Sequence, residues 1–317
     1  MHMTMLVKLL NTLLMVVVAL SITGVINRTR AVLAGRRGTR FLQHIYNVRL
    51  LSRKGAVYST TTTALFRIAP CVYLGAAIMA FLFIPIADLN PLLSFHGDII
   101  LVAYLLAFSR FALILAAMDT GSSFEGMGAA REALYGALVE PALMMGLATL
   151  ALFCGNSSFA EIFSQEQVLD VNLTVVLLLV AYIFVMIMFI EGGRVPVDDP
   201  KTHLELTMIH EVMCLDYSGI DLAMIQIAGW LKNAIFAILA ANAVSVVFCF
   251  HWQFAVPLAV FGTGIAIGIV ESFRARNKLS RNTTYIITIV AMAALVLLTG
   301  FLLNSQEDLF MFENIEI

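Results

Sequence analysis

Long apolar runs alternate with short polar segments along this chain. Runs of about 20 apolar residues, enough for a helix that crosses roughly 30 Å of hydrocarbon, occur near residues 5–26, 68–87, 98–118, 134–154, 171–190, 222–250, 253–273 and 282–303. The sixth run is longer than one crossing requires, so we expect it to tilt, kink or begin at the membrane interface. The pattern predicts an all-α polytopic membrane protein with about eight transmembrane helices, forming a single transmembrane domain over residues 1–317.

The composition agrees with this pattern. Apolar residues make up 61% of the chain and charged residues 13%, whereas soluble domains contain about 45–50% and about 25%. The net charge is −2 and the basic residues are confined to a few loops, which argues against a nucleic-acid partner. The run at 5–26 is interpreted as a transmembrane helix, not a cleaved signal peptide, because no small-x-small cleavage site follows it.

No cofactor or metal is expected on the chain itself. Its four cysteines are isolated and show no Cys-x-x-Cys spacing, whereas an iron–sulfur cluster needs grouped thiolates. His203 and His210 are seven residues apart, on one helical face, but they do not form a His-Glu-x-x-His signature. The sequence also has no nucleophile elbow or phosphate-binding glycine loop, so we identify no catalytic residue.

The basic residues predict the sidedness of the chain. Of the 19 Lys and Arg residues, 16 fall in alternate loops, whereas the opposite loops at 88–97, 155–170 and 251–252 and the tail at 304–317 contain none. By the positive-inside rule, both termini should face the outer compartment. The first cytoplasmic loop, 27–67, mixes nine basic residues with apolar ones and is expected to form amphipathic surface helices. A second surface element is expected at 122–133.

Residues 191–221 place seven carboxylates between two apolar runs. At a membrane boundary a carboxylate loses solvation, which favours its protonated form unless cations such as Arg194, Lys201, His203 or His210 compensate. Such a cluster can hold and pass protons near neutral pH. Other roles stay open: Asp198 or Asp199, just before Pro200, can cap a helix, and Glu211 can be a solvated or subunit-facing charge.

Glu140 lies inside the fourth apolar run. Its ionised form should cost roughly 2.5–3.5 kcal/mol at the centre of a membrane helix, so pairing or proton sharing with Lys232 or Arg110, the cations at depth, is expected. The alternative is a protonated, hydrogen-bonded packing residue. For Asp119, a place in a proton path and a structural role in a helix-ending turn are equally compatible with the sequence.

Several motifs resemble those of a known family. Glu191-Gly-Gly-Arg194-Val-Pro196-Val-Asp198-Asp-Pro200, Glu205-Leu206 and Asp216-Tyr-Ser-Gly219 resemble the signature loop of the quinone-site membrane subunit of respiratory complex I. The chain departs from that loop at Gly193, which replaces Asn, and at Lys201 and His203, which replace acids. Other segments are similar to the homologous membrane anchor subunit of energy-converting nickel–iron hydrogenases, the formate hydrogenlyase and hydrogenase-4 component C branch: Gly35-Arg-Arg-Gly38, Phe66-Arg67-Ile-Ala-Pro70, Asp119-Thr-Gly-Ser-Ser-Phe and Arg131-Glu132 through Glu140-Pro141.

The resemblance implies a non-catalytic subunit of a membrane-bound oxidoreductase in the prokaryotic cytoplasmic (inner) membrane. Such a subunit docks a peripheral redox arm, whose subunits carry iron–sulfur and, in the hydrogenase branch, nickel–iron centres, and couples electron transfer to proton or ion movement toward antiporter-like membrane subunits. Lipid is the other expected partner, and nucleic acid is not expected. The candidate proton-pathway residues are Glu140, Glu191, Asp198, Asp199, Glu205, Glu132, Asp119, Lys232 and Glu211. The candidate partner-docking residues are Arg36, Arg37, Arg194, His203 and His210.

Three alternative functions stay open at this point. In the complex I branch the acidic loop borders a quinone chamber, so the chain could be the quinone-binding subunit of an NADH dehydrogenase complex. A stand-alone secondary ion transporter would place its substrate beside Glu140, Arg110 and Lys232, but the sequence lacks the internal repeat that many transporters show. A passive anchor would use the same charges only as interface contacts.

Overall fold

The computed structural model describes residues 2–86, 90–163, 171–198, 208–247 and 255–313. Within these ranges, eight helices are long and apolar enough to cross a membrane, which confirms the predicted number. They are α1 (His2–Leu33), α3 (Ala64–Leu82), α4 (Asp98–Asp119), α5 (Ser123–Cys154), α7 (Val171–Glu191), α8 (Gly219–Val247), α9 (Ala255–Phe273) and α10 (Leu279–Glu313). Three short helices join them: α2 (Gln43–Leu51), α6 (Phe159–Ile162) and the 3-10 helix η1 (Glu211–Cys214).

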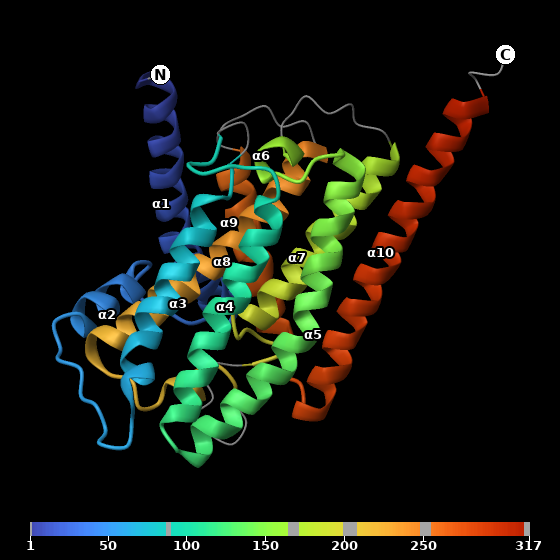
Figure 1. The fold of residues 1–317 in the computed structure, drawn as a ribbon. Coiled ribbons are helices and arrows are strands. Elements are labelled where there is room, and N and C mark those ends of the chain that lie inside the picture. Colours follow the sequence, from blue (N-terminus) through green and yellow to red (C-terminus); the bar gives the residue numbers. More distant parts are fainter. Residues whose placement is uncertain (1, 87–89, 164–170, 199–207, 248–254, 314–317) are drawn as a thin grey trace.

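Both ends of the described chain lie at the same end of the bundle (Figure 1), as an even number of crossings requires. Which side of the membrane they face stays a prediction. The surface-lying helices of the first loop are likewise untested by a structure without a membrane. Within 27–67, α2 has no buried residue, and it contacts the bundle through His44, whose ring meets Trp230 of α8 edge-on at 4.8 Å.

The helix interruption expected at 122–133 is wrong, whereas a position of this segment at the membrane surface stays untested. These residues form the first turns of α5, which runs without interruption from Ser123 to Cys154. A glycine inside a helix costs about 1 kcal/mol relative to alanine, which made this segment look like a break. Here Gly128 lies where a side chain would overlap Val212 of η1, so the glycine allows close packing instead of ending the helix.

Helix α8 lies at the centre of the bundle, packed against α1, α3, α7 and α9. This position explains why its polar residues Lys232, Asn233, Asn242 and Ser245 are all buried. Two of them are satisfied locally, because Asn242 donates to the Pro85 carbonyl at 2.8 Å and Ser245 donates to the Asn242 carbonyl at 2.9 Å. The polar residues therefore lie inside the protein, where a neighbouring helix can compensate them.

Helix α3 is held to the segment before α8 by a hydrogen bond that a proline makes available. Pro70 lies inside α3 and has no N–H to donate to the carbonyl of Phe66, four residues earlier. The hydroxyl of Tyr217 donates to this carbonyl at 2.9 Å instead, and the two aromatic rings stack with centroids 4.0 Å apart. The motifs around Phe66–Pro70 and Asp216–Gly219 thus meet in space.

Candidate functional site

Arg110 of α4 joins three carboxylates from two other helices. Its Nε lies 3.4 Å from Glu132, its Nη1 lies 3.2 Å from Glu140, and its Nη2 contacts Glu191 at the end of α7. Glu132 and Glu140 are eight residues apart on one face of α5, with Gly136 between them. A side chain at Gly136 would overlap the guanidinium, so this glycine makes the room in which Arg110 meets both carboxylates.

Lys232 of α8 completes this buried network. Its Nζ lies 3.6 Å from Oε2 of Glu191 and 4.8 Å from the ring centroid of Tyr73, a cation–π contact. The side chains of Lys232 and Glu191 are 3% and 4% exposed, so each charge depends on the other for compensation, and Glu191 also depends on Arg110. The pairing expected between Glu140 and the two deep cations is confirmed for Arg110; Lys232 pairs with Glu191 instead.

His210 connects this network to the turn after α7. Its Nδ1 lies 3.3 Å from Oε2 of Glu132, and its Nε2 lies 3.0 Å from the Ile190 carbonyl. When Nε2 carries the proton it donates to that carbonyl, which leaves Nδ1 facing the carboxylate. Gly193, in a left-handed conformation at φ +55°, lies against the His210 ring, where a Cβ would come within 2.7 Å of Cδ2. The glycine found in place of the family's asparagine therefore accommodates this histidine.

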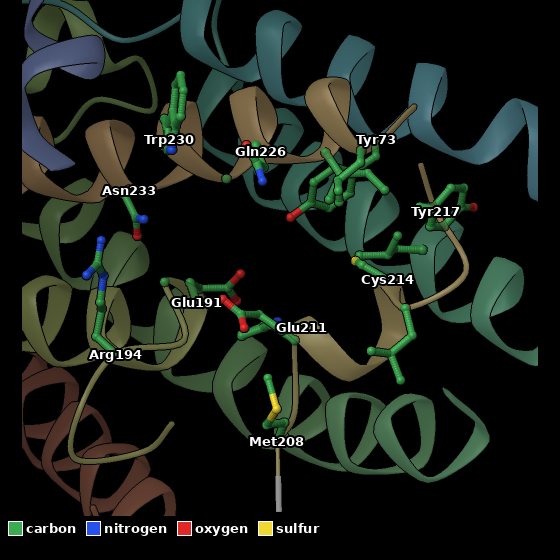
Figure 2. A pocket seen from close by; sticks show the side chains of 17 residues that line it. Tyr73, Glu191, Arg194, Met208, Glu211, Cys214, Tyr217, Gln226, Trp230 and Asn233 are labelled. Atoms are coloured by element: carbon green, nitrogen blue, oxygen red, sulfur yellow. The ribbon is translucent and has the colours of Figure 1, made fainter. Parts of the chain in front are cut away.

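A cavity of about 580 Å³ lies beside the network, between α8, α3, η1 and the turn after α7. Figure 2 shows Glu191 and Glu211 on one side of it, with Tyr73, Cys214 and Tyr217 toward the other end. Asn233, which also borders the cavity, has a buried Oδ1 without a hydrogen-bond partner among the described residues. The cavity thus has an apolar, aromatic part and a polar part that reaches Glu191.

Burial acts on the two titratable groups of the connecting segment that line this cavity. It raises the pKa of the Cys214 thiol to about 12, with a smaller contribution from the negative charges of Glu125, Glu211 and Glu132. Burial likewise raises the pKa of Tyr217 above its usual range. Both groups are therefore neutral hydrogen-bond donors at physiological pH, and neither adds a charge to the cavity.

A second charged cluster lies on the other side of the turn after α7. Arg194 lies 3.5 Å from Oε1 of Glu271 in α9, and Arg30 of α1 lies 3.6 Å from its Oε2. Nearby, Asp198 pairs with Arg276 at 2.9 Å and accepts a hydrogen bond from the Ile209 N–H at 2.9 Å. The turn that ends α7 is therefore fixed to α9 and to the segment before α10, and Glu271 of α9 is in turn paired with α1.

The structure brings together part of the predicted set. Glu132, Glu140, Glu191, Lys232 and His210 form one network, and Arg194 and Glu211 border the adjacent cavity. Outside this network, Asp119 accepts hydrogen bonds from the backbone N–H and the hydroxyl of Thr63, the N-cap residue of α3, at 2.7 and 2.9 Å. Arg36 and Arg37 are exposed in the first loop. Asp199, Glu205 and His203 lie outside the described residues.

Three residues of the second cluster, Arg30, Glu271 and Arg276, were not among the candidates, although one of them carried a visible signal. Glu271 is a carboxylate inside the seventh apolar run, the same signal that singled out Glu140, and its side chain is 0% exposed. Arg276 had no such signal, because it is one of several basic residues in a loop. No group of three or more His, Cys, Asp or Glu side chains in the described ranges is arranged to hold a metal ion.

The sequence matches the family model of NADH dehydrogenase over residues 5–305. The chain belongs to this family. It is 35% identical over 217 residues to hydrogenase-4 component C of Escherichia coli K12, covering 68% of this chain and 67% of the relative. It is 31% identical over 217 residues to formate hydrogenlyase subunit 4 of the same organism, covering 68% and 70%. An NADH-quinone oxidoreductase subunit of Orientia tsutsugamushi (strain Ikeda) is 23% identical over 178 residues, 56% of this chain and 50% of the relative.

Solved structures share the fold. A chain of the membrane-bound sulfane sulfur reductase, an archaeal respiratory membrane complex, superposes with a TM-score of 0.73 at 22% identity, covering 94% of this chain and 99% of the other. This member of the NADH dehydrogenase family is thus homologous to membrane subunits of hydrogenase and complex I type assemblies, as its motifs indicated. With eight apolar helices, it is a multi-pass protein of the prokaryotic inner membrane.

Proposed function

We propose that the chain is the membrane subunit of a complex I-like oxidoreductase of the energy-converting hydrogenase type. It docks the peripheral redox arm and couples electron transfer there to proton or ion movement. The hydrogenase-4 and formate hydrogenlyase relatives support this assignment over an isolated transporter. The chain itself binds no redox cofactor in this proposal; iron–sulfur and nickel–iron centres belong to the partner subunits.

One observation carries the proposal: the network runs from the cavity to the outside of the bundle. At one end, Glu191 borders the cavity and is 4% exposed. At the other end, the side chain of Glu140, near the middle of α5, is 43% exposed. A carboxylate facing lipid at that depth is costly. We therefore place an antiporter-like membrane subunit against Glu140, where a polar group of that subunit would complete its environment.

The charges of the network favour a mobile proton. Arg110 and Lys232 supply two positive charges, and Glu132, Glu140 and Glu191 supply three negative charges when ionised. With His210 neutral, one carboxylate is in excess, and protonating it balances the group. Because all three carboxylates contact Arg110, a change of charge near Glu191 alters which of them holds the proton. An electron arriving in the docked arm is the proposed source of that change.

The docking surface is proposed at the basic first loop and the turn after α7. Arg36 and Arg37 are exposed, while Arg194 and His210 border the cavity. His203 is proposed to join them. Purification of the intact complex from native membranes tests this assignment: iron–sulfur subunits should co-purify with the chain, whereas an isolated, transport-active oligomer of this chain would contradict it.

The coupling role is tested in inverted membrane vesicles that contain the assembled complex. Glu140→Gln and Glu191→Gln keep the side-chain shape but cannot take up a proton, so the number of protons moved per electron pair should fall while the complex still assembles. Glu161→Gln, a matched change in α6 outside the network, should behave as the unmodified protein. Unchanged coupling in both network variants would show that the network is not the route.

A second candidate function follows from the cavity, whose aromatic and apolar part could hold a quinone ring and the start of its tail. In that case the chain would form the quinone site of an NADH dehydrogenase type complex. This function would be supported if the purified complex reduces quinone and if Tyr73→Leu lowers the rate of that reduction. Full redox activity with a soluble acceptor, and no quinone reduction, would support the hydrogenase-type assignment.

A further inference from the structure

Arg194 and Glu191 lie three residues apart at the same cavity, yet they do not pair. Glu191 contacts Arg110 and Lys232, while Arg194 contacts Glu271. Figure 2 shows the guanidinium of Arg194 turned away from the Glu191 carboxylate. An arginine beside a buried carboxylate normally forms an ion pair with it, because a bidentate pair compensates both desolvated charges. Another contact must therefore keep the Arg194 guanidinium away from Glu191.

That contact is the ion pair between Arg194 and Glu271. Its side chain is 0% exposed, and its Oε1 lies 3.5 Å from Nη1 of Arg194, which is 10% exposed. A fully buried carboxylate in an apolar helix is costly unless it is paired. Glu271 therefore needs a cation as much as Arg194 needs a carboxylate, and their pairing removes Arg194 from competition for Glu191.

The packing of α9 on α1 fixes the position of Glu271. Gly264 and Gly268 of α9 lie one helical turn apart against α1, and a Cβ on Gly268 would come within 2.7 Å of the Thr29 side chain. Such small residues let two membrane helices approach closely. The close approach brings Arg30 to 3.6 Å from Oε2 of Glu271. The carboxylate is therefore held from two sides and cannot follow Arg194 toward the cavity.

We propose that Glu271 is a positioning residue that acts through Arg194. It keeps this arginine away from Glu191, so that Glu191 forms ion pairs only with Arg110 and Lys232. This inference rests on the proposed coupling function. Without Glu271, Arg194 turns into the cavity and pairs with Glu191. Because a third cation then stabilises the ionised carboxylate, Glu191 takes up a proton less readily. Glu271 thereby lets Glu191, at the cavity end of the network, exchange its proton when the charge nearby changes. Glu271 itself does not contact Glu191.

The test compares Glu271→Gln in two backgrounds, using the assembled complex in inverted vesicles. With Arg194 present, Glu271→Gln should lower the number of protons moved per electron pair toward the value of Glu191→Gln in the same vesicles. With Arg194→Gln already present, the same change should have no further effect, because no arginine remains to compete. A loss of equal size in both backgrounds, or none in either, would overturn the proposal.

Two further measurements keep the test decisive. If Arg194→Gln alone stops coupling, a structure of the Glu271→Gln complex decides: Arg194 should pair with Glu191, and an unmoved Arg194 overturns the proposal. If Glu271→Gln lowers the amount of assembled complex, adding Arg194→Gln should restore it by removing the arginine that turns into the cavity and pairs with Glu191, and no recovery overturns the proposal. Glu191→Gln in the same vesicles separates the two ideas, because unchanged coupling there contradicts the proposed function itself.

Discussion

The ammonium of Lys232 lies 3.6 Å from the carboxylate of Glu191, and both side chains are almost completely buried. The two residues come from different helices, α8 and α7, and Glu191 also contacts Arg110 of α4. The three helices therefore share one charge-paired group. A change in the protonation of Glu191 acts on both cations at once, and through Arg110 on Glu132 and Glu140.

Arg110 should contribute more to stability than Lys232. Arg110→Met leaves Glu140 without a cation in the described structure and removes one partner each from Glu132 and Glu191. Removing one partner of a buried ion pair costs about 3–5 kcal/mol. Lys232→Met leaves Glu191 still paired with Arg110, so its cost should be smaller. Thermal unfolding of the detergent-solubilised complex measures both, and equal midpoints for the two variants would contradict the central place of Arg110.

The hydrogen bond from Tyr217 to Phe66 should matter only because of Pro70. Tyr217→Phe leaves the buried Phe66 carbonyl without a donor, which should cost about 1–3 kcal/mol. Pro70→Ala supplies an N–H four residues after Phe66, so the helix can satisfy this carbonyl itself. The cost of Tyr217→Phe should therefore be smaller in the Pro70→Ala background. Equal losses of thermal stability in both backgrounds would show that the hydroxyl has another role.

Cys214 should resist alkylation near neutral pH. Burial raises the pKa of its thiol from 9.0 to about 12, so the thiolate fraction should be about a thousandfold lower than for an ordinary thiol. The labelling rate should rise roughly tenfold per pH unit as the pH approaches 12. The native state binds this proton more tightly than the unfolded state, so the associated stability is complete below pH 9.0 and is lost as the pH rises toward about 12.

Mass spectrometry of the alkylated chain follows this reaction at the single residue. The same chain unfolded in detergent is the control, since Cys214 then regains ordinary reactivity. Equal labelling of the folded and unfolded chains at neutral pH would contradict the burial of this thiol beside the cavity.

Hydropathy alone predicted the eight crossings, because each buries a run of about 20 apolar residues. The cost of a charge in hydrocarbon likewise singled out Glu140 and Lys232 from their places in the apolar runs. The same rule should have pointed to Glu271, which lies in the seventh apolar run. The sequence could not reveal that Glu191 pairs with Lys232, because that contact depends on how α7 and α8 pack.

Local rules failed where tertiary contacts decide the outcome. Gly126 and Gly128 looked like a break before the fourth crossing, but α5 is continuous, and Gly128 allows close packing against Val212. The sequence was compatible with a proton path and with a structural role for Asp119. In the structure Asp119 joins the end of α4 to Thr63 at the start of α3, a structural contact, and its place in a proton path stays a prediction. For Asp199, Glu205 and His203, which lie outside the described residues, the proposed roles stay predictions from the sequence.

Redox-induced infrared difference spectroscopy of the intact complex tests the central claim most directly, because it observes a carboxyl group gaining or losing its proton. When the docked arm is reduced, a carboxyl band should change, and this change should be lost in Glu191→Gln or Glu140→Gln but retained in Glu161→Gln. Identical difference spectra from all four proteins, unmodified and variant, would contradict a network that exchanges protons in step with electron transfer.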